Sequence, residues 1–300
     1  MLRISKISFP GLGIGEFSVN SVAFKIGDIE IAWYALLITF GMVCAVAYTI
    51  HKARKIGVTS SDILDIALWT IPAGIIGARL YYVLTKLDEF SSIGEFFNIR
   101  GGGLAIYGGI IGGAIAVFIC CYVKKINFFA IGDCCTPGII LAQAIGRWGN
   151  FINGEAFGYE TDVFIRMGLQ NTLTGGRLQY VHPTFLYESI WNIIGFVLVN
   201  LFYRKKQYDG QIILMVFGWY GLGRMFIEGL RTDSLYTTIF SWTFRTSQVL
   251  AAVIFTACAA LLIYFIFKKP QRELYFKPAK PAAEEAEVKT ESNDNKNENE

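Results

Sequence analysis

The apolar residues of this chain are gathered into long runs that are separated by short polar segments. A helix needs roughly 20 predominantly apolar residues to cross a bilayer. Seven runs meet this length, at about 31–50, 64–84, 104–123, 128–147, 184–203, 211–230 and 246–267. Glycine, proline and polar residues interrupt the second and fourth runs, which membrane helices tolerate. The pattern predicts an all-α polytopic membrane protein with about seven transmembrane helices.

The polar segments between the runs predict an orientation in the membrane. Dense clusters of Lys and Arg follow the first, third, fifth and seventh runs, at residues 52–55, 124–125, 204–206 and 268–272. Because cytoplasmic ends are enriched in Lys and Arg, we expect the N-terminus outside and the C-terminus in the cytoplasm. The longest internal loop, 148–183, then faces outward, and we expect it to form a small head outside the membrane.

The composition of the chain also agrees with a membrane protein. Hydrophobic residues make up 53% of the chain and charged residues only 17%, whereas soluble domains carry about 25% charged residues. The net charge of +3 gives no reason to expect a nucleic-acid partner. We expect an outward-facing segment at 1–30, a seven-helix transmembrane domain at 31–267, and a charged, disordered cytoplasmic tail at 268–300.

The fourth run ends in the polar sequence GRWGNFINGEAFG, residues 146–158. At 100° per residue, Arg147, Asn150 and Asn153 form a strip with about 60° between successive members. If the helix continues through the motif, Glu155 lies about 80° to the other side of Arg147. An arginine at a helix end often extends its side chain to the lipid headgroups. Two asparagines and a glutamate beside it favour a binding cavity.

A second polar group lies in the sixth run, within WYGLGRMFIEGLRTD at residues 219–233. Tyr220, Arg224, Glu228 and Arg231 fall within about 80° on a helical wheel and share one face. An internal salt bridge is the simpler interpretation. However, Glu228 can neutralise only one arginine of the strip, so we expect at least one guanidinium to remain available for an anion such as phosphate.

Two further motifs are weaker. HPTFLYE, residues 182–188, opens the fifth run, where His182 precedes a proline that starts a helix well. The third run opens with GGGLAIYGGIIGG, which contains two overlapping G-x-x-x-G patterns, Gly108/Gly112 and Gly109/Gly113. Such glycines let another helix approach closely. Close packing is one interpretation of them, and a lipid-binding groove is the other.

These motifs together predict an anion-binding cavity that opens toward the outer leaflet. No His/Cys/Asp cluster with ligand spacing calls for a metal, and no G-x-x-x-x-G-K-[ST] loop indicates a nucleotide-driven pump. Composition and spacing do not name a reaction. An enzyme, a transporter or flippase of an anionic solute, and a structural or chaperone-like protein that binds signal peptides without chemistry all stay open. A transporter would often show an internal repeat, and none is visible.

The motifs resemble those of the bacterial prolipoprotein diacylglyceryl transferase family. GRWGNFINGEAFG matches the family signature throughout, and RGGGLAIYGG, HPTFLYE and YGLGRMFIEGLR-x-D follow the family's order. The resemblance covers about residues 30–267. It implies a multi-pass enzyme of the bacterial cytoplasmic membrane, without a cofactor, whose active site faces the outer leaflet.

The resemblance also implies a reaction and its partners. The enzyme would move the diacylglyceryl group of phosphatidylglycerol to the lipobox cysteine of a preprolipoprotein, forming a thioether and releasing glycerol-1-phosphate. This would be the first step of lipoprotein maturation, and its product would pass to signal peptidase II.

Carried over residue by residue, the resemblance implies two groups of site residues. Catalytic roles fall on Arg147, Arg224, Tyr34, Tyr107, Tyr220 and His182. Headgroup binding falls on Arg147, Asn150, Asn153, Glu155, Gly158, Glu228 and Arg231. Tyr107 is a departure, because some members carry at this place a histidine with a proposed base role. Tyrosine, with a pKa near 10, is a poorer base at neutral pH. We therefore expect Tyr107 to orient the thiol or the lipid, and His182 to have a positional role.

Overall fold

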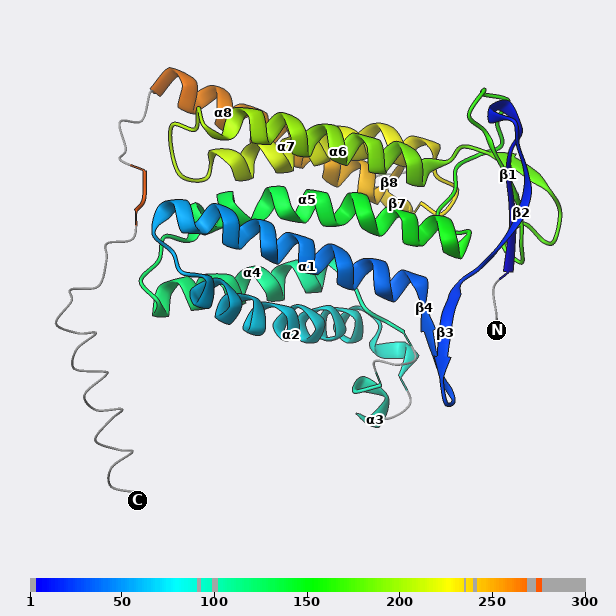
Figure 1. Cartoon of the computed structure of the whole chain (residues 1–300), viewed down its shortest axis with the longest axis horizontal. Helices are drawn as coiled ribbons and strands as arrows, with labels where there is room; N and C mark the ends of the chain where they lie inside the picture. The colour runs from blue at the N-terminus through cyan, green and yellow to red at the C-terminus, as the bar shows by residue number, and fades with distance from the viewer. Residues whose placement is uncertain are drawn as a thin grey trace. The chain divides into compact units, whose positions relative to one another are not determined.

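The computed structural model describes residues 4–90, 93–98, 102–234, 236–239, 242–268 and 274–276. Within these ranges seven helices are long and apolar enough to cross a membrane, which confirms the prediction of a mostly helical, polytopic membrane protein (Figure 1). They are α1 (Trp33–Ala53), α2 (Ser60–Thr85), α4 (Ile106–Val123), α5 (Phe128–Asn153), α6 (Thr184–Tyr203), α7 (Gln211–Ile227) and α8 (Thr246–Lys268). Most of the expected tail, 268–300, lies outside the described residues, and its disorder stays a prediction.

The chain divides into two compact units. The first comprises residues 1–50 and 127–274, and the second comprises residues 51–126 and 275–300. The first unit holds most of α1, helices α5 to α8 and the described strands. The second holds α2, α4 and the short helix α3 (Ile93–Phe96).

Short strands in the first unit add to the helices. They are β1 (Ile4–Phe9), β2 (Ile14–Asn20), β3 (Val22–Ile26), β4 (Ile29–Ala32), β5 (Met167–Gln170), β6 (Gln179–Val181), β7 (Tyr236–Ile239) and β8 (Trp242–Arg245). An antiparallel sheet has the strand order β2-β1-β5-β6, while β3-β4 and β7-β8 form separate hairpins. Two strands of this sheet, β5 and β6, come from the 148–183 segment, and the other two come from the N-terminal segment. That residues 148–183 form a head outside the membrane stays a prediction.

The sheet is packed onto the ends of two helices. Ile7 of β1 and Leu169 of β5, which are paired in the sheet, are fully buried. They belong to one apolar cluster with Phe185 at the start of α6, and Phe151 near the end of α5 packs against that cluster. Burial of these side chains supplies most of the attachment, since each buried large apolar side chain contributes about 1.5–3 kcal/mol.

Helix α5 is longer than the sequence pattern predicted. Asn127 caps its start by accepting hydrogen bonds from the backbone N–H groups of Phe129 and Ala130, at 2.9 and 3.1 Å. The helix continues to Asn153 and ends at Gly154, whose φ of 61° is left-handed. A side chain at Gly154 would also meet Ser5 Oγ at 2.3 Å. The polar strip of the fourth run is therefore helical as far as Asn153.

Two tryptophans join α6 to α7. Trp191 and Trp219 stack with their ring centroids 4.3 Å apart. Each indole N–H donates to the backbone carbonyl of the other residue, at 3.0 and 2.9 Å. Gly195 and Gly223 provide the space, because a Cβ at either position would lie within 2.4 Å of an indole ring. This contact helps to position Glu188, which precedes Trp191 on α6, and Arg224, which follows Trp219 on α7.

A carboxylate from α5 caps the start of α7. Asp133 is fully buried and accepts hydrogen bonds from the N–H groups of Gly210 and Ile213, at 2.8 and 3.0 Å. Lys206 donates to the same carboxylate at 3.0 Å. A negative charge at a helix N-terminus is favourable, so α7 is fastened to α5 at this end.

In the second unit, α2 and α4 pack through glycine. A Cβ at Gly108 would lie 2.2 Å from the carbonyl oxygen of Gly77, and one at Gly112 would lie 2.5 Å from that of Ala73. The Gly108/Gly112 pattern therefore serves close helix packing.

Candidate functional site

One buried glutamate of α6 gathers three arginines in the first unit. Glu188 Oε2 lies 2.7 Å from Nη2 of Arg147, at the end of α5. Its other oxygen, Oε1, lies 3.2 Å from Nη1 of Arg224 on α7 and 3.3 Å from Nη1 of Arg231. Only 7% of the Glu188 side chain is exposed. Its desolvation is tolerable because the charge is paired on both oxygens.

Two more carboxylates complete what we call the arginine cluster, which consists of Arg147, Arg224, Arg231, Glu188, Glu228 and Asp233. Glu228 Oε2 lies 2.5 Å from Nη2 of Arg224, at an angle that makes this an ionic contact without hydrogen-bond geometry. Asp233 accepts a bidentate pair from Arg231, at 2.9 and 2.7 Å. Among the described residues, three carboxylates thus face three guanidinium groups, whereas the sequence analysis had counted Glu228 alone. That a guanidinium is available for an outside anion stays a prediction.

The paired side chains of Arg231 and Asp233 in the arginine cluster have shifted pKa values. Burial raises the pKa of the Asp233 carboxyl, but the hydrogen bonds and the charge of Arg231, together with the charge of Arg224, hold the pKa below its ordinary value. Burial alone would lower the pKa of Arg231, but its hydrogen bond to Asp233 and the charge of Glu188 raise this pKa above its ordinary value. Both groups are therefore charged at neutral pH.

Arg147 is the most accessible of the three arginines, with 22% of its side chain exposed against 15% for Arg224 and 10% for Arg231. Within the described chain, the hydrogen bonds and ion pairs of its guanidinium go to Asn150, at 3.3 Å, and to Glu188. A guanidinium carries five N–H groups, so Arg147 keeps donors for a ligand.

The polar strip comes together as the sequence predicted, with one change. Asn150 and Asn153 both donate to Glu155 Oε1, at 3.1 and 3.0 Å. Because α5 ends at Asn153, Glu155 does not lie on the helix, and its expected angle on the wheel is wrong. The left-handed turn at Gly154 instead brings its carboxylate back over the strip. Arg231 also lies beyond its helix, since α7 ends at Ile227 and a 3₁₀ turn covers Glu228–Leu230.

The two candidate tyrosines that lie in the first unit, Tyr34 and Tyr220, have different surroundings. Tyr34, at the start of α1, packs its ring against α5, where a Cβ at Gly149 would lie 2.4 Å from Tyr34 Cδ2. It lies within electrostatic reach of Glu155 and Arg147. Tyr220 lies one helical turn before Arg224 on α7, and no hydrogen bond joins it to the arginines in the described part of the chain. Its role stays a prediction.

Gly158 lies where two backbone segments meet. Its N–H donates to the carbonyl of His182 at 3.0 Å, and it forms an antiparallel bridge with Arg231. A Cβ at Gly158 would lie 2.7 Å from Cβ of His182 and 2.8 Å from the carbonyl oxygen of Leu230. The motif glycine is thus required by close approach of the backbone. It holds the loop of residues 155–160 against the segment that carries Arg231.

His182 contributes to the same junction. Its Nδ1 lies 3.1 Å from the Tyr187 hydroxyl, and its backbone N–H donates to Tyr159 at 3.0 Å. Burial lowers the pKa of the imidazole, which favours the neutral form. These contacts fit the positional role expected for His182.

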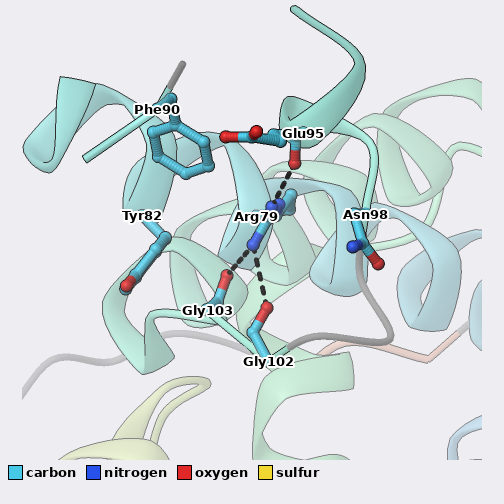
Figure 2. Close-up of a pocket in the computed structure, with 7 residues that line it drawn as sticks. All are labelled: Arg79, Tyr82, Phe90, Glu95, Asn98, Gly102 and Gly103. Atoms are coloured by element: carbon cyan, nitrogen blue, oxygen red, sulfur yellow. Dashed lines mark hydrogen bonds between the residues drawn. The ribbon is translucent and has the colours of Figure 1, made fainter. Parts of the chain in front are cut away.

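Tyr107 belongs to the second unit, at the second residue of α4, where its ring centroid lies 6.3 Å from that of Tyr81. The same unit contains a cavity of about 230 Å³ beside Arg79, lined also by Tyr82, Phe90, Glu95, Asn98, Gly102 and Gly103 (Figure 2). Arg79 donates to the backbone carbonyls of Glu95, Phe96, Gly102 and Gly103, at 2.6–2.9 Å. At most one of its five N–H groups is left for a ligand, so Arg79 fastens a loop and does not offer an anion site.

Sequence reasoning left two residues out of the candidate site, Glu188 and Asp233. Glu188 is a carboxylate inside a predicted span, where an ionisable residue is by default a functional candidate. That signal was present in HPTFLYE. Asp233 ends the motif that contains Arg231, and nothing in its spacing indicates a bidentate pair. Among the described residues, no group of three or more His, Cys, Asp or Glu is placed to hold a metal ion.

Comparison with known proteins gives one consistent result. The family model described as prolipoprotein diacylglyceryl transferase matches residues 21–264. A phosphatidylglycerol–prolipoprotein diacylglyceryl transferase of Clostridioides difficile is 46% identical over 72% of this chain and 85% of its own length. Enzymes with that name from Clostridium perfringens and Enterococcus faecalis are each 43% identical, over 86% and 82% of this chain and over 99% and 90% of their own lengths.

Proposed function

The chain belongs to the prolipoprotein diacylglyceryl transferase family, and from this premise we propose how its arginine cluster serves the transfer. The enzyme moves the diacylglyceryl group of phosphatidylglycerol to a cysteine thiol of a prolipoprotein. The cysteine sulfur forms a C–S bond to the glyceryl carbon while the C–O bond to phosphate breaks. The bonding electrons leave with glycerol-1-phosphate, and the thiol proton passes to a base or to water.

The observation that carries the proposal is the sharing of Glu188 by three arginines. The leaving phosphate gains negative charge as the C–O bond breaks, and preorganised guanidinium groups stabilise such charge without reorganising. Glu188 holds Arg147, Arg224 and Arg231 at contacts of 2.7–3.3 Å. Because the cluster is already charge-balanced, phosphate binds by drawing N–H donors away from the carboxylates and by using the free donors of Arg147.

The remaining site residues have supporting roles in this proposal. Asn150, Asn153 and Glu155 form a hydrogen-bonded strip beside Arg147 that suits the hydroxyl groups of the glycerol headgroup. Gly158 keeps the loop close to Arg231, and Glu228 orients Arg224. Tyr34 packs against α5 at Gly149, two residues after Arg147, and Tyr220 lies one helical turn before Arg224 on α7.

The thiol is activated by its electrostatic surroundings. A free thiol has a pKa near 8.5, and nearby cations favour the more nucleophilic thiolate. Tyr107 orients the thiol or the lipid and does not act as a fixed base. If Tyr107→Phe turns over as fast as the wild type, this role for the hydroxyl is excluded.

The membrane orientation follows the basic clusters, with the N-terminus outside, the C-terminus in the cytoplasm and the arginine cluster toward the outer leaflet. The acceptor is then the lipobox cysteine of a preprolipoprotein whose signal peptide lies in the bilayer. The lipidated product passes to signal peptidase II.

The test is release of glycerol phosphate by the purified protein from phosphatidylglycerol and a lipobox peptide. We expect release from the wild type, none with a Cys→Ala peptide, and a loss of about 100-fold or more for Arg147→Ala, the size of effect seen when one oxyanion-stabilising donor is removed. Arg177→Ala is the matched control, because Arg177 is exposed in the loop between β5 and β6. A folded wild-type protein without release, beside an active relative, would contradict the proposal and favour the anion transporter.

A further inference from the structure

Arg245, the last residue of β8, lies at the start of α8 and was singled out by no sequence motif. Its Nη1 donates to the backbone carbonyl of Glu228, and its Nη2 donates to the Tyr159 hydroxyl at 3.0 Å. Its guanidinium carbon also lies 5.7 Å from the ring centroid of Tyr159 and 5.8 Å from that of Tyr236. Such distances allow cation–π attraction to both rings.

The two groups that Arg245 joins belong to different parts of the proposed site. Tyr159 lies in the loop of residues 155–160, which carries Glu155 and Gly158. Glu228 begins the 3₁₀ turn that leads to Arg231. The backbones of the two segments also meet directly, because the Tyr159 N–H donates to the Leu230 carbonyl at 2.9 Å.

The start of α8, from which Arg245 reaches these segments, is attached to α7 by other contacts. Gln248, three residues later on α8, donates to the Met225 carbonyl of α7 at 2.8 Å. Farther along, the two helices touch closely, since a Cβ at Gly221 would lie 2.8 Å from the carbonyl oxygen of Ala251. Arg245 therefore extends from a helix whose place on α7 is fixed by other contacts.

The contacts of Arg245 distinguish it from the arginines of the cluster. Arg147, Arg224 and Arg231 each contact a carboxylate, which an anion can replace. Arg245 instead donates to a backbone carbonyl and to a phenol oxygen, two uncharged acceptors that belong to two different segments. Its chemistry is that of a clamp between two backbone segments.

We propose that Arg245 is a positioning residue for the transfer, which holds the loop of Glu155 and Gly158 and the turn of Glu228 in the mutual placement that the arginine cluster needs. This inference rests on the proposed function. Misplacement of a catalytic group by about 1 Å can cost about 100-fold in rate. The clamp is thus expected to affect turnover more strongly than lipid binding.

The test compares Arg245→Ala, Arg245→Lys and Tyr159→Phe with Arg177→Ala as control. For Arg245→Ala we expect kcat to fall by about 10- to 100-fold, with KM for phosphatidylglycerol changed by less than about threefold. Arg245→Lys keeps the charge and one donor nitrogen, and should recover part of the loss. Tyr159→Phe removes one of the two hydrogen bonds of Arg245, and its kcat should fall less than that of Arg245→Ala. The double variant Arg245→Ala/Tyr159→Phe should be no slower than Arg245→Ala, because the two residues act as one unit.

Amide hydrogen exchange provides a readout that does not depend on activity. In Arg245→Ala, peptides covering 155–160 and 228–232 should exchange faster, while those of α7 before Met225 should not change. Equal kcat for Arg245→Ala and Arg177→Ala, with an active wild type, would overturn the inference. So would unchanged exchange in both segments, or equal losses in Arg245→Lys and Arg245→Ala. An inactive wild type would contradict the proposed function. Faster exchange in Arg245→Ala would then still show that Arg245 holds the two segments together.

Discussion

The contact of Glu188 with three arginines leads to a specific prediction for Glu188→Gln. The substitution keeps the shape of the side chain but removes the only charge shared by Arg147, Arg224 and Arg231 within the described residues. The new amide nitrogen is a donor, and it faces N–H groups that are also donors. Three guanidinium groups are then left with two carboxylates in a largely buried site.

The magnitude follows from burial. Removing one partner of a buried ion pair costs about 3–5 kcal/mol, because the other charge stays buried without its counter-charge. At about 2 °C per kcal/mol, the low end of the range for large domains, Glu188→Gln should unfold about 6–10 °C below the wild type. The matched control is Glu16→Gln, whose side chain is about half exposed and pairs with Lys6 at 2.9 Å. Such surface pairs contribute little, so the control should unfold like the wild type.

The assay is thermal unfolding of the detergent-purified protein, with and without inorganic phosphate. Phosphate can replace the lost negative charge, and a ligand at about 100 times its Kd stabilises a protein by about 2.7 kcal/mol. We therefore expect phosphate to stabilise Glu188→Gln more than the wild type, in which Glu188 competes for the same donors. The reasoning is refuted if Glu188→Gln unfolds together with Glu16→Gln, or if phosphate raises the unfolding temperature of both proteins equally.

Two other predictions concern the junction beside the cluster. Gly158→Ala would place a Cβ 2.8 Å from the carbonyl oxygen of Leu230, and should lower the free energy of unfolding by about 1–3 kcal/mol, whereas Gly15→Ala, with no atom within 4 Å, should unfold like the wild type. Equal unfolding temperatures for the two variants would show that the junction yields without strain. Burial lowers the pKa of His182 below its ordinary 6.5, so the folded state binds fewer protons than the unfolded state. Its contribution to stability is complete above about pH 6.5 and is lost as the pH falls through the folded-state pKa, so His182→Gln should show a flatter dependence of unfolding temperature on pH between about 7 and 5. A wild type and a variant with the same slope would contradict this assignment.

The spanning helices were predictable because their signal is local. A run of about 20 apolar residues is sufficient to identify a span, whatever it packs against. The ends of the helices were less predictable, because they depend on contacts with distant residues. Helix α5 continues to Asn153 since Gly154 turns into a left-handed conformation beneath Ser5, which is far away in the sequence.

The sheet was not predicted, and β1 shows the reason. Its buried residues include Ser5 together with Ile7, while Ile4 is exposed. The strand therefore lacks a clear alternation of apolar and polar residues. Ser5 is buried without penalty because Asn171 donates to its hydroxyl at 3.2 Å, a partner that no local pattern indicates.

In the candidate site, the sequence indicated which residue types gather but not how their charges balance. Arg147, Arg224 and Arg231 meet as the motifs predicted. Their common partner, Glu188, comes from a helix whose motif had been interpreted through His182. Periodicity places residues on the face of one helix, whereas the contact of α6 with α7 involves the packing of Trp191 against Trp219, which are far apart in the sequence.

The pairing of β1 with β5 has a consequence for how the chain is assembled. Ile7 pairs with Leu169, and α1, α2, α4 and α5 lie between them in the sequence. These four spans return the chain to the side of the membrane on which it began, so β1 and β5 lie on the same side and can pair. During synthesis, however, β1 emerges long before β5. It can pair with β2 at once, but its other edge has no partner strand until the fourth span has been inserted. Long-range pairing of this kind is slow to form. Closure of the sheet, and with it the final placement of the polar end of α5, is therefore a late step in the folding of this enzyme.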